Sequence, residues 1–216
     1  MDAYENLFNC RDINKIIDSI NDMLPASMCA CCHGRYHVMC VVDVTERILQ
    51  SLSHDARTIE LGKIAALLHD IGSIAGRRNH ARKGAALASV LLDDLANVTP
   101  EEKSMIIQAI EDHSDGNNIS SAIGAAVFIA DKVHIIKRRV RPLENIDAWH
   151  SNLLEIEDME LCISGNTVTI NFKTTEAFSK ELLLDEYKSK LDLIMRAAEY
   201  LGCTCDIHFS GIGELP

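Results

Sequence analysis

Apolar residues recur every three or four positions through most of the chain, which is the spacing of an amphipathic helix. The first clear run covers residues 12–24, and the next covers 35–51, where one face is broad enough to be mostly buried. The same spacing predicts further helices over 59–70, 81–95, 99–113, 119–138 and 182–201. The pattern therefore predicts a mainly α protein.

One of these helices has a strong start signal. Thr99 is a good N-cap, Pro100 suits the first helical position, and Glu102 completes a capping box. The helix that they open is expected to run to about His113.

The pattern changes after residue 145. Short β-prone runs over 159–163 and 167–172 flank Ser164-Gly165-Asn166, which is a hairpin signal. The helix over 182–201 and a strand over 205–209 follow. We therefore expect residues 1–145 to form a helical metal-binding domain and residues 146–216 to form a small α+β C-terminal appendage.

Charge and composition limit the kinds of molecule that the protein is expected to bind and the compartment in which we expect it. A chain of 216 residues can bury one sizeable core, and a formal charge of −11 disfavours a nucleic-acid or anionic-membrane surface. No run approaches the ~20 apolar residues needed to span a bilayer. The beginning, MDAYENLFNCRD, is acidic and unlike a signal peptide, so we expect a cytoplasmic protein.

The chain has eight cysteines, which in the cytoplasm are expected to be reduced or bound to metal. One alternative is a zinc knot built from Cys29, Cys31, Cys32 and His33, which Cys203 and Cys205 could close. The cluster lacks paired C-x-x-C spacing, so reduced and mostly buried thiols are the favoured interpretation.

A set of polar residues interrupts the apolar helices or lies at their ends. It comprises His37, His69, Asp70, His80, His113 and Asp131. Imidazole nitrogens and carboxylate oxygens are ligands for divalent transition metals. Because aspartate can bridge two ions, Asp70 is the natural bridge of a two-metal site. The histidines at 54, 134, 150 and 208 match no such position and are predicted to be surface or packing residues.

The ordered set carries a family resemblance. The stretches are RYHVMCVVDVTERIL, AALLHDIG, NHARKGA, IEDHSDG and FIADKV. Over about residues 30–141 they resemble the HD superfamily of metal-dependent phosphohydrolases. The arrangement of AIxxH, a short polar turn and IADK is most similar to the YqeK-like branch, whose members cleave diadenosine tetraphosphate symmetrically to two ADP.

The resemblance implies an HD-domain helical bundle with two metal ions, iron or manganese rather than zinc. One ion would be held by His37, His69, Asp70 and Asp131, and the other by Asp70, His80 and His113, with water or hydroxide between them. Asp70 is thereby the expected catalytic residue. Ser73 stands where many relatives carry a lysine that can touch phosphate. The fourth motif has one histidine instead of the His-His pair of the HD-GYP cyclic dinucleotide phosphodiesterases, and the GYP motif of those enzymes is absent, which disfavours a cyclic dinucleotide substrate.

These features predict a phosphohydrolase in which a metal-activated water attacks a small phosphorylated substrate, expected to be a nucleotide. Arg77, Arg78 and Lys83 are the candidates for phosphate contact, and a solvated basic loop is the alternative. The basic run Lys137, Arg138, Arg139 and Arg141 is expected to be a solvated helix end, with a partner site as the alternative.

Two other function classes stay open. One is a catalytically weak regulatory HD module that binds metal and nucleotide, and the other is a structural zinc protein organised by the cysteines. A homodimer through the N-terminal helix or the appendage also stays open.

Overall fold

The helical part of the chain precedes the sheet in sequence. A computed structural model describes residues 2–27, 29–142 and 144–211. Its first helices are α1 (Ala3–Phe8), α2 (Arg11–Met23), α3 (Arg35–Ser51), α4 (Ala56–Leu68), the 3-10 helix η1 (Ile71–Ala75), α5 (His80–Asp93), α6 (Pro100–Asp112) and α7 (Ala122–Val133). The C-terminal elements are the 3-10 helix η2 (Lys137–Arg139), α8 (Ala148–Leu153), β1 (Ile156–Ser164), β2 (Thr167–Thr174), α9 (Lys180–Tyr200) and β3 (Thr204–Gly211).

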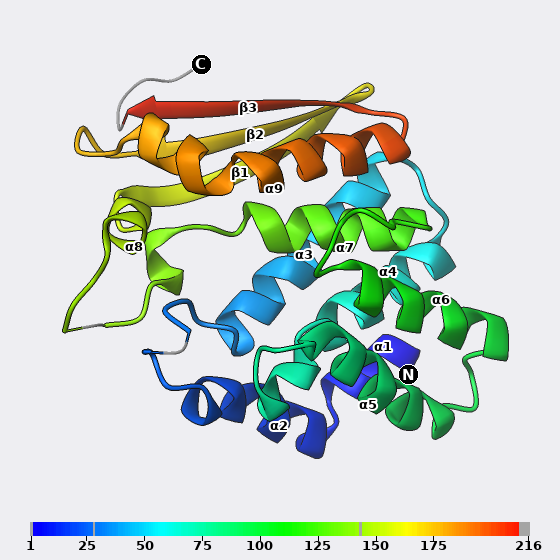
Figure 1. Ribbon diagram of the computed structural model, residues 1–216. Coiled ribbons are helices and arrows are strands. Elements are labelled where there is room, and N and C mark those ends of the chain that lie inside the picture. The colour runs from blue at the N-terminus through cyan, green and yellow to red at the C-terminus, as the bar shows by residue number, and fades with distance from the viewer. Residues whose placement is uncertain (1, 28, 143, 212–216) are drawn as a thin grey trace.

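Helix α7 occupies the centre of the molecule, between the sheet with α9 and the remaining helices (Figure 1). It packs against α3, α4, α6 and α9, and almost every residue from Ile123 to Val133 is buried. A helix that is apolar on all sides has to be surrounded by other elements. Its burial places Asp131, in the last turn, inside the protein.

Capping residues fix where the helices begin. The predicted capping box is confirmed: the Thr99 hydroxyl accepts from the Glu102 backbone N–H, and the Glu102 carboxylate accepts from the Thr99 backbone N–H. Helix α4 begins at Ala56, earlier than the apolar spacing predicts, because the Asp55 carboxylate accepts from the N–H groups of the first turn.

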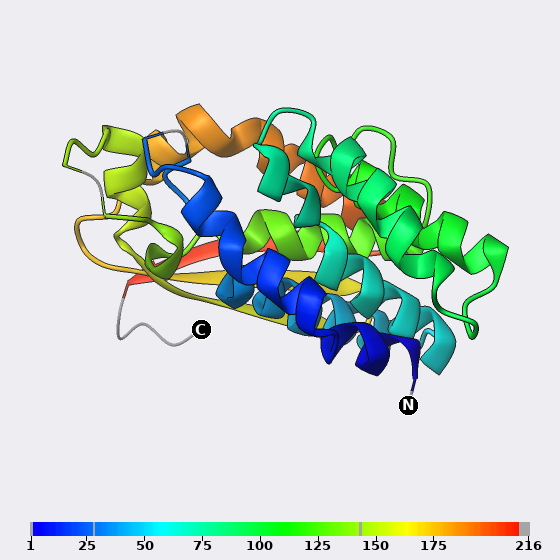
Figure 2. The ribbon, with the colours of Figure 1, turned by 90° about the horizontal axis from the view of Figure 1, so that it is seen from below.

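The C-terminal part is the predicted α+β appendage. Strands β1 and β2 pair antiparallel, and β2 pairs parallel with β3 after the crossover through α9. Val168, Ile170 and Phe172 of β2 are buried. The view from below shows the helices covering the sheet (Figure 2). The mainly α fold with a small α+β appendage is thus confirmed. The division at residues 145 and 146 stays a prediction, and residues 212–216 lie outside the described chain.

One predicted helix is shorter than its sequence pattern indicates. The prediction of a single helix over 119–138 is wrong, because α7 ends at Val133 and the chain continues to an isolated β-bridge between Cys31 and Val140. The backbone N–H of Cys32 donates to the Arg139 carbonyl over 2.7 Å. This long-range pairing competes with helix continuation.

The basic run after α7 is also not a solvated helix end. Arg139 is buried, and its guanidinium donates to the carbonyls of Cys32 and His134. Arg141 donates to the carbonyls of Leu24 and Asn21, where α2 ends. The carbonyls of Asn21, Leu24 and His134 lie at helix ends, where intrahelical partners are missing, and that of Cys32 lies in the loop before α3. The two arginines therefore tie this loop and the end of α2 to the segment after α7.

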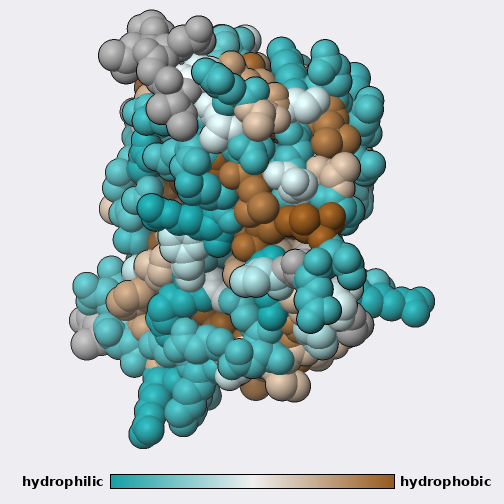
Figure 3. All heavy atoms as spheres, turned by 90° about the vertical axis from the view of Figure 1, so that its left-hand side faces the viewer, coloured by the Kyte–Doolittle hydropathy of each residue, from teal (hydrophilic) through white to brown (hydrophobic). Residues whose placement is uncertain are grey.

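Apolar residues are unevenly distributed on the molecular surface. At the end of the molecule that carries α8, a short band of apolar residues crosses the middle between two largely hydrophilic regions (Figure 3). Within the described residues, no helix is both long enough and apolar enough to cross a bilayer.

Candidate metal centre

All six candidate ligands converge in the helical part of the fold. His37 lies in the first turn of α3, His69 and Asp70 follow α4, His80 opens α5, His113 follows α6, and Asp131 lies in the last turn of α7. Every one of them is buried. Three overlapping groups could each hold an ion, with ligand atoms within 4.8 Å of one another: His37, His69 and Asp70; His69, His113 and Asp131; and Asp70, His80 and His113.

Backbone hydrogen bonds orient three of the histidines. Nδ1 lies 2.7 Å from the Ala66 carbonyl in His69, 3.0 Å from the Arg77 carbonyl in His80 and 2.6 Å from the Ile110 carbonyl in His113. A carbonyl oxygen only accepts, so each Nδ1 carries the proton and each neutral ring keeps a lone pair on Nε2. This arrangement is typical of histidines that bind metal through Nε2.

The nitrogen and oxygen atoms that face the inside of the cluster include more hydrogen-bond acceptors than donors. Nε2 of His80 lies 3.1 Å from Nε2 of His113, although both nitrogens hold lone pairs. Oδ2 of Asp70 is buried and has no hydrogen-bond partner. Buried polar atoms are nearly always paired, so this surplus of acceptors fits a divalent cation among them.

Two basic side chains lie against the carboxylates. Nη1 of Arg77 is 2.6 Å from Oδ1 of Asp70, and Nζ of Lys132 is 2.6 Å from Oδ2 of Asp131. Burial alone would raise the pKa of Asp70, but Arg77 and His69 outweigh it and hold that pKa well below its usual range. Burial is likewise outweighed at Asp131, whose pKa is lowered mainly by Lys132 and His37. Both candidate ligands are therefore carboxylates at neutral pH.

The candidates for phosphate contact are not equivalent. Arg77 is partly buried and reaches the cluster, where it donates to Asp70 and to the Ser73 hydroxyl. Arg78 is exposed, and the exposed Lys83 donates to the Ala75 carbonyl over 2.7 Å. The structure therefore brings only Arg77 of the three to the candidate ligands.

Two further histidines contact the cluster. His134 is 2 % exposed, and its Nδ1 lies 2.9 Å from Nδ1 of His37. His134 is thus a buried packing residue, which is one of the two predicted options, and it touches the candidate ligand His37. Helical spacing could not have revealed this contact, because His134 follows the last helical residue, Val133, and its own backbone is not helical.

His33 also reaches the cluster, from the loop before α3. Its ring lies edge-on to His37 at 5.7 Å, and its Nδ1 is 2.9 Å from the Cys31 carbonyl and 3.4 Å from Sγ of Cys29. Among the described residues, none of the groups that could hold a metal includes a cysteine. The geometry thus gives no support to the zinc knot.

The buried histidines should make the metal-free protein sensitive to acid. Burial lowers the pKa of His33 and of His134 to about 3 and that of His80 to about 4. Histidines of the unfolded chain take up protons below about pH 6.5, whereas these buried histidines stay neutral in the folded protein. The free energy of unfolding is therefore highest above that pH and falls as the pH drops toward 4. Each unit of difference between the pKa values of a group in the folded and unfolded states contributes ~1.4 kcal/mol to the free energy of unfolding. The raised pKa of His69, where Asp70 outweighs burial, reduces this loss.

Urea unfolding in the presence of a chelator measures this effect. The midpoint is expected to fall steadily from pH 7 to pH 4.5, and a His33→Gln variant should lose less over the same interval. A midpoint that stays constant would show that these histidines are not held neutral by the fold.

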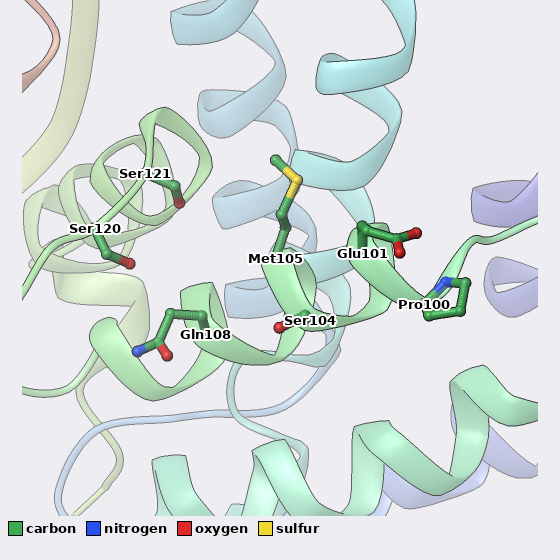
Figure 4. Close-up of a pocket in the computed structure, with 7 residues that line it drawn as sticks. All are labelled: Pro100, Glu101, Ser104, Met105, Gln108, Ser120 and Ser121. Carbon is green, nitrogen blue, oxygen red and sulfur yellow. The ribbon is translucent and has the colours of Figure 1, made fainter.

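A surface hollow on α6 is separate from the candidate ligands. It is lined by Pro100, Glu101, Ser104, Met105, Gln108, Ser120 and Ser121 (Figure 4). None of these residues belongs to the histidine and aspartate cluster, and Glu101 is the only ionisable one.

Comparison with known proteins gives one family. Residues 35–136 match the HD domain family. A crystal structure of a predicted HD superfamily hydrolase from an uncultured Thermotogales bacterium is similar, with 24% identity, coverage of 63% of this chain and 75% of that chain, and a TM-score of 0.46. No curated protein matches. The segment that contains every candidate ligand is thus the segment that matches the HD domain.

Proposed function

We propose that this protein is a metal-dependent phosphohydrolase of the HD superfamily that cleaves a nucleotide or a related phosphate ester or anhydride. The observation that carries the proposal is the buried cluster in which imidazole lone pairs and an unpartnered carboxylate oxygen face one another. The match of residues 35–136 to the HD domain supports it.

The geometry of Asp70 supports two ions rather than one. Its Oδ2 lies 3.4 Å from Nε2 of His69 and 3.7 Å from Nε2 of His37. Its Oδ1 lies 3.3 Å from Nε2 of His80 and 3.8 Å from Nε2 of His113. Each carboxylate oxygen thus faces a different pair of histidines, as a bridging ligand requires. His37, His69, Asp70 and Asp131 would hold one ion, and Asp70, His80 and His113 the other. Nitrogen and oxygen donors of this kind suit iron or manganese.

A bound divalent ion would lower the pKa of water toward neutrality and so supply the nucleophile for an in-line displacement at phosphorus. The chain's own residues orient the site. Ser73 and Arg77 both donate to Oδ1 of Asp70 and fix the carboxylate. The side chain of Arg77 is 30% exposed whereas that of Asp70 is 1% exposed, so the guanidinium lies on the solvent side. From there it can form paired hydrogen bonds with a phosphate.

Small phosphorylated molecules are the partners that fit this site. A net charge of −11 opposes binding to nucleic acid or to an anionic membrane, whereas Arg77 and Lys132 provide positive charge next to the cluster. Diadenosine tetraphosphate is the first substrate to test, because of the resemblance to the YqeK-like branch.

Arg77 and its neighbour Arg78 form a matched pair for mutation. The Arg77→Gln variant is expected to lose about 10- to 100-fold in kcat/KM, because it lacks a charge-assisted contact to the phosphate. Arg78→Gln removes the same charge from an exposed position and should change kcat/KM little. Steady-state kinetics on the best substrate measures both variants. Equal losses would indicate a general charge effect instead of a contact by Arg77.

Phosphate or nucleotide release tests the proposed function. The panel is diadenosine tetraphosphate, nucleoside phosphates and a generic phosphodiester, assayed with added Fe²⁺ or Mn²⁺ and after chelation. We expect turnover of at least one substrate, its loss on chelation and its return on adding metal. Bound metal without turnover of any substrate would favour the regulatory module instead.

A further inference from the structure

His37 is held differently from the other histidines of the cluster. His69, His80 and His113 each donate from Nδ1 to a backbone carbonyl, whereas Nδ1 of His37 faces Nδ1 of His134 at 2.9 Å. The two rings are nearly parallel, with an interplanar angle of 6° and centroids 5.2 Å apart. Only one proton fits between these nitrogens, so one ring donates and the other accepts.

The position of this proton decides whether His37 can bind a metal. If His134 donates, neutral His37 carries its own proton on Nε2, where Oδ1 of Asp131 lies 3.0 Å away and accepts it. If His37 donates, its Nε2 holds a lone pair that faces the cluster, and neutral His134 carries its proton on Nε2. Only the second arrangement makes Nε2 of His37 a ligand.

The surroundings favour the first arrangement when no ion is bound. Nε2 of His134 is buried and has no hydrogen-bond partner. In the first arrangement that atom is only an acceptor, and the Nε2–H of His37 is paired with Asp131. In the second, a buried N–H of His134 is unpaired, and the His37 lone pair faces the Asp131 carboxylate. The second arrangement therefore needs a cation at His37 to become the more stable one.

We propose that His134 is a positioning residue of the metal centre, whose Nδ1 accepts the Nδ1 proton of His37 when an ion binds. The pair exchanges one neutral arrangement for the other: a proton leaves Nε2 of His37, one arrives on Nε2 of His134, and the net charge of the pair is unchanged. The inference rests on the metal binding in the proposed function and is independent of hydrolysis.

Nitrogen-15 NMR of the histidine side chains tests the exchange directly, with diamagnetic Zn²⁺ as the probe and the His134→Asn variant to assign the signals. In the metal-free protein we expect Nε2 of His37 to be protonated and Nε2 of His134 to be bare. Zinc should reverse both states. The same protonated nitrogen in His134 before and after zinc binding would overturn the proposal.

Two substitutions separate the hydrogen bond from packing. His134→Leu fills the space but offers no acceptor, and it should weaken Zn²⁺ or Mn²⁺ binding by about 10- to 100-fold. His134→Asn places an amide oxygen near the position of Nδ1 and should recover most of that loss. Circular dichroism and urea unfolding of the metal-free proteins establish whether each variant folds. If His134→Leu does not fold, the NMR result on the natural protein alone decides whether His134 accepts the proton of His37.

Equal loss of metal affinity in the two variants, or no loss in either, would contradict the role of His134. A natural protein that binds metal but hydrolyses no substrate would refute the proposed reaction and leave the His37–His134 pair intact.

Discussion

The Asp70→Asn variant is expected to lose hydrolysis almost completely, with a rate reduced by about 10³-fold or more. Both carboxylate oxygens of Asp70 face histidine pairs, and Oδ1 also accepts from Arg77. Asparagine keeps the shape but removes the negative charge and turns an N–H group toward one pair. Bound metal measured after gel filtration should fall together with activity.

Asp112 offers a matched control. It is a buried aspartate next to His113, but its carboxylate accepts from Gln108 and Ser120 instead of facing the cluster. Asp112→Asn should therefore keep its metal and its activity, even where it lowers stability. Full metal content and turnover in Asp70→Asn would contradict the assigned site.

The Gly72→Ala variant is expected to be destabilised by about 3 kcal/mol or more, measured as the free energy of unfolding in urea. A Cβ atom at Gly72 would lie within 3.0 Å of the His80 carbonyl oxygen and of backbone atoms of Gly84. Backbone atoms of η1 and α5 cannot yield as a side chain can. Because Asp70 precedes Gly72 by two residues and His80 supplies the contact, pushing η1 away from α5 would also move Asp70 away from His80, and an ion held by both should bind more weakly.

Gly62 is the comparison for this prediction. A Cβ atom there would also come within 3.0 Å of another atom, but that atom is the terminal Cδ1 of Leu49, which can move. Because alanine also favours the helix by ~1 kcal/mol over glycine, Gly62→Ala should cost much less. Equal destabilisation by the two substitutions would mean that η1 and α5 do not need their close backbone approach.

Local sequence patterns were sufficient for most of the helical fold. Apolar spacing located the long helices, and Thr99 and Glu102 marked the start of α6 because a capping box acts within four residues. The six candidate ligands stood out because each is a polar residue in or beside an apolar helix, and the structure brings all six together. Their role as ligands stays a prediction.

Long-range contacts explain what the sequence did not reveal. The end of α7 at Val133 depends on the pairing of Cys31 with Val140, which lie far apart in the chain. Because the helix stops there, His134 turns toward His37, and Arg139 is drawn inward to bind carbonyl groups. Helical periodicity reports the amphipathicity of one segment and contains no information about such partners.

Elemental analysis of the purified natural protein tests whether the buried cluster is a divalent metal centre. We expect one to two equivalents of iron or manganese per chain, and removal by a chelator should be reversible on adding either ion. A fully folded protein that retains no transition metal, and that binds neither Fe²⁺ nor Mn²⁺ in a titration, would show that the cluster is not a metal centre.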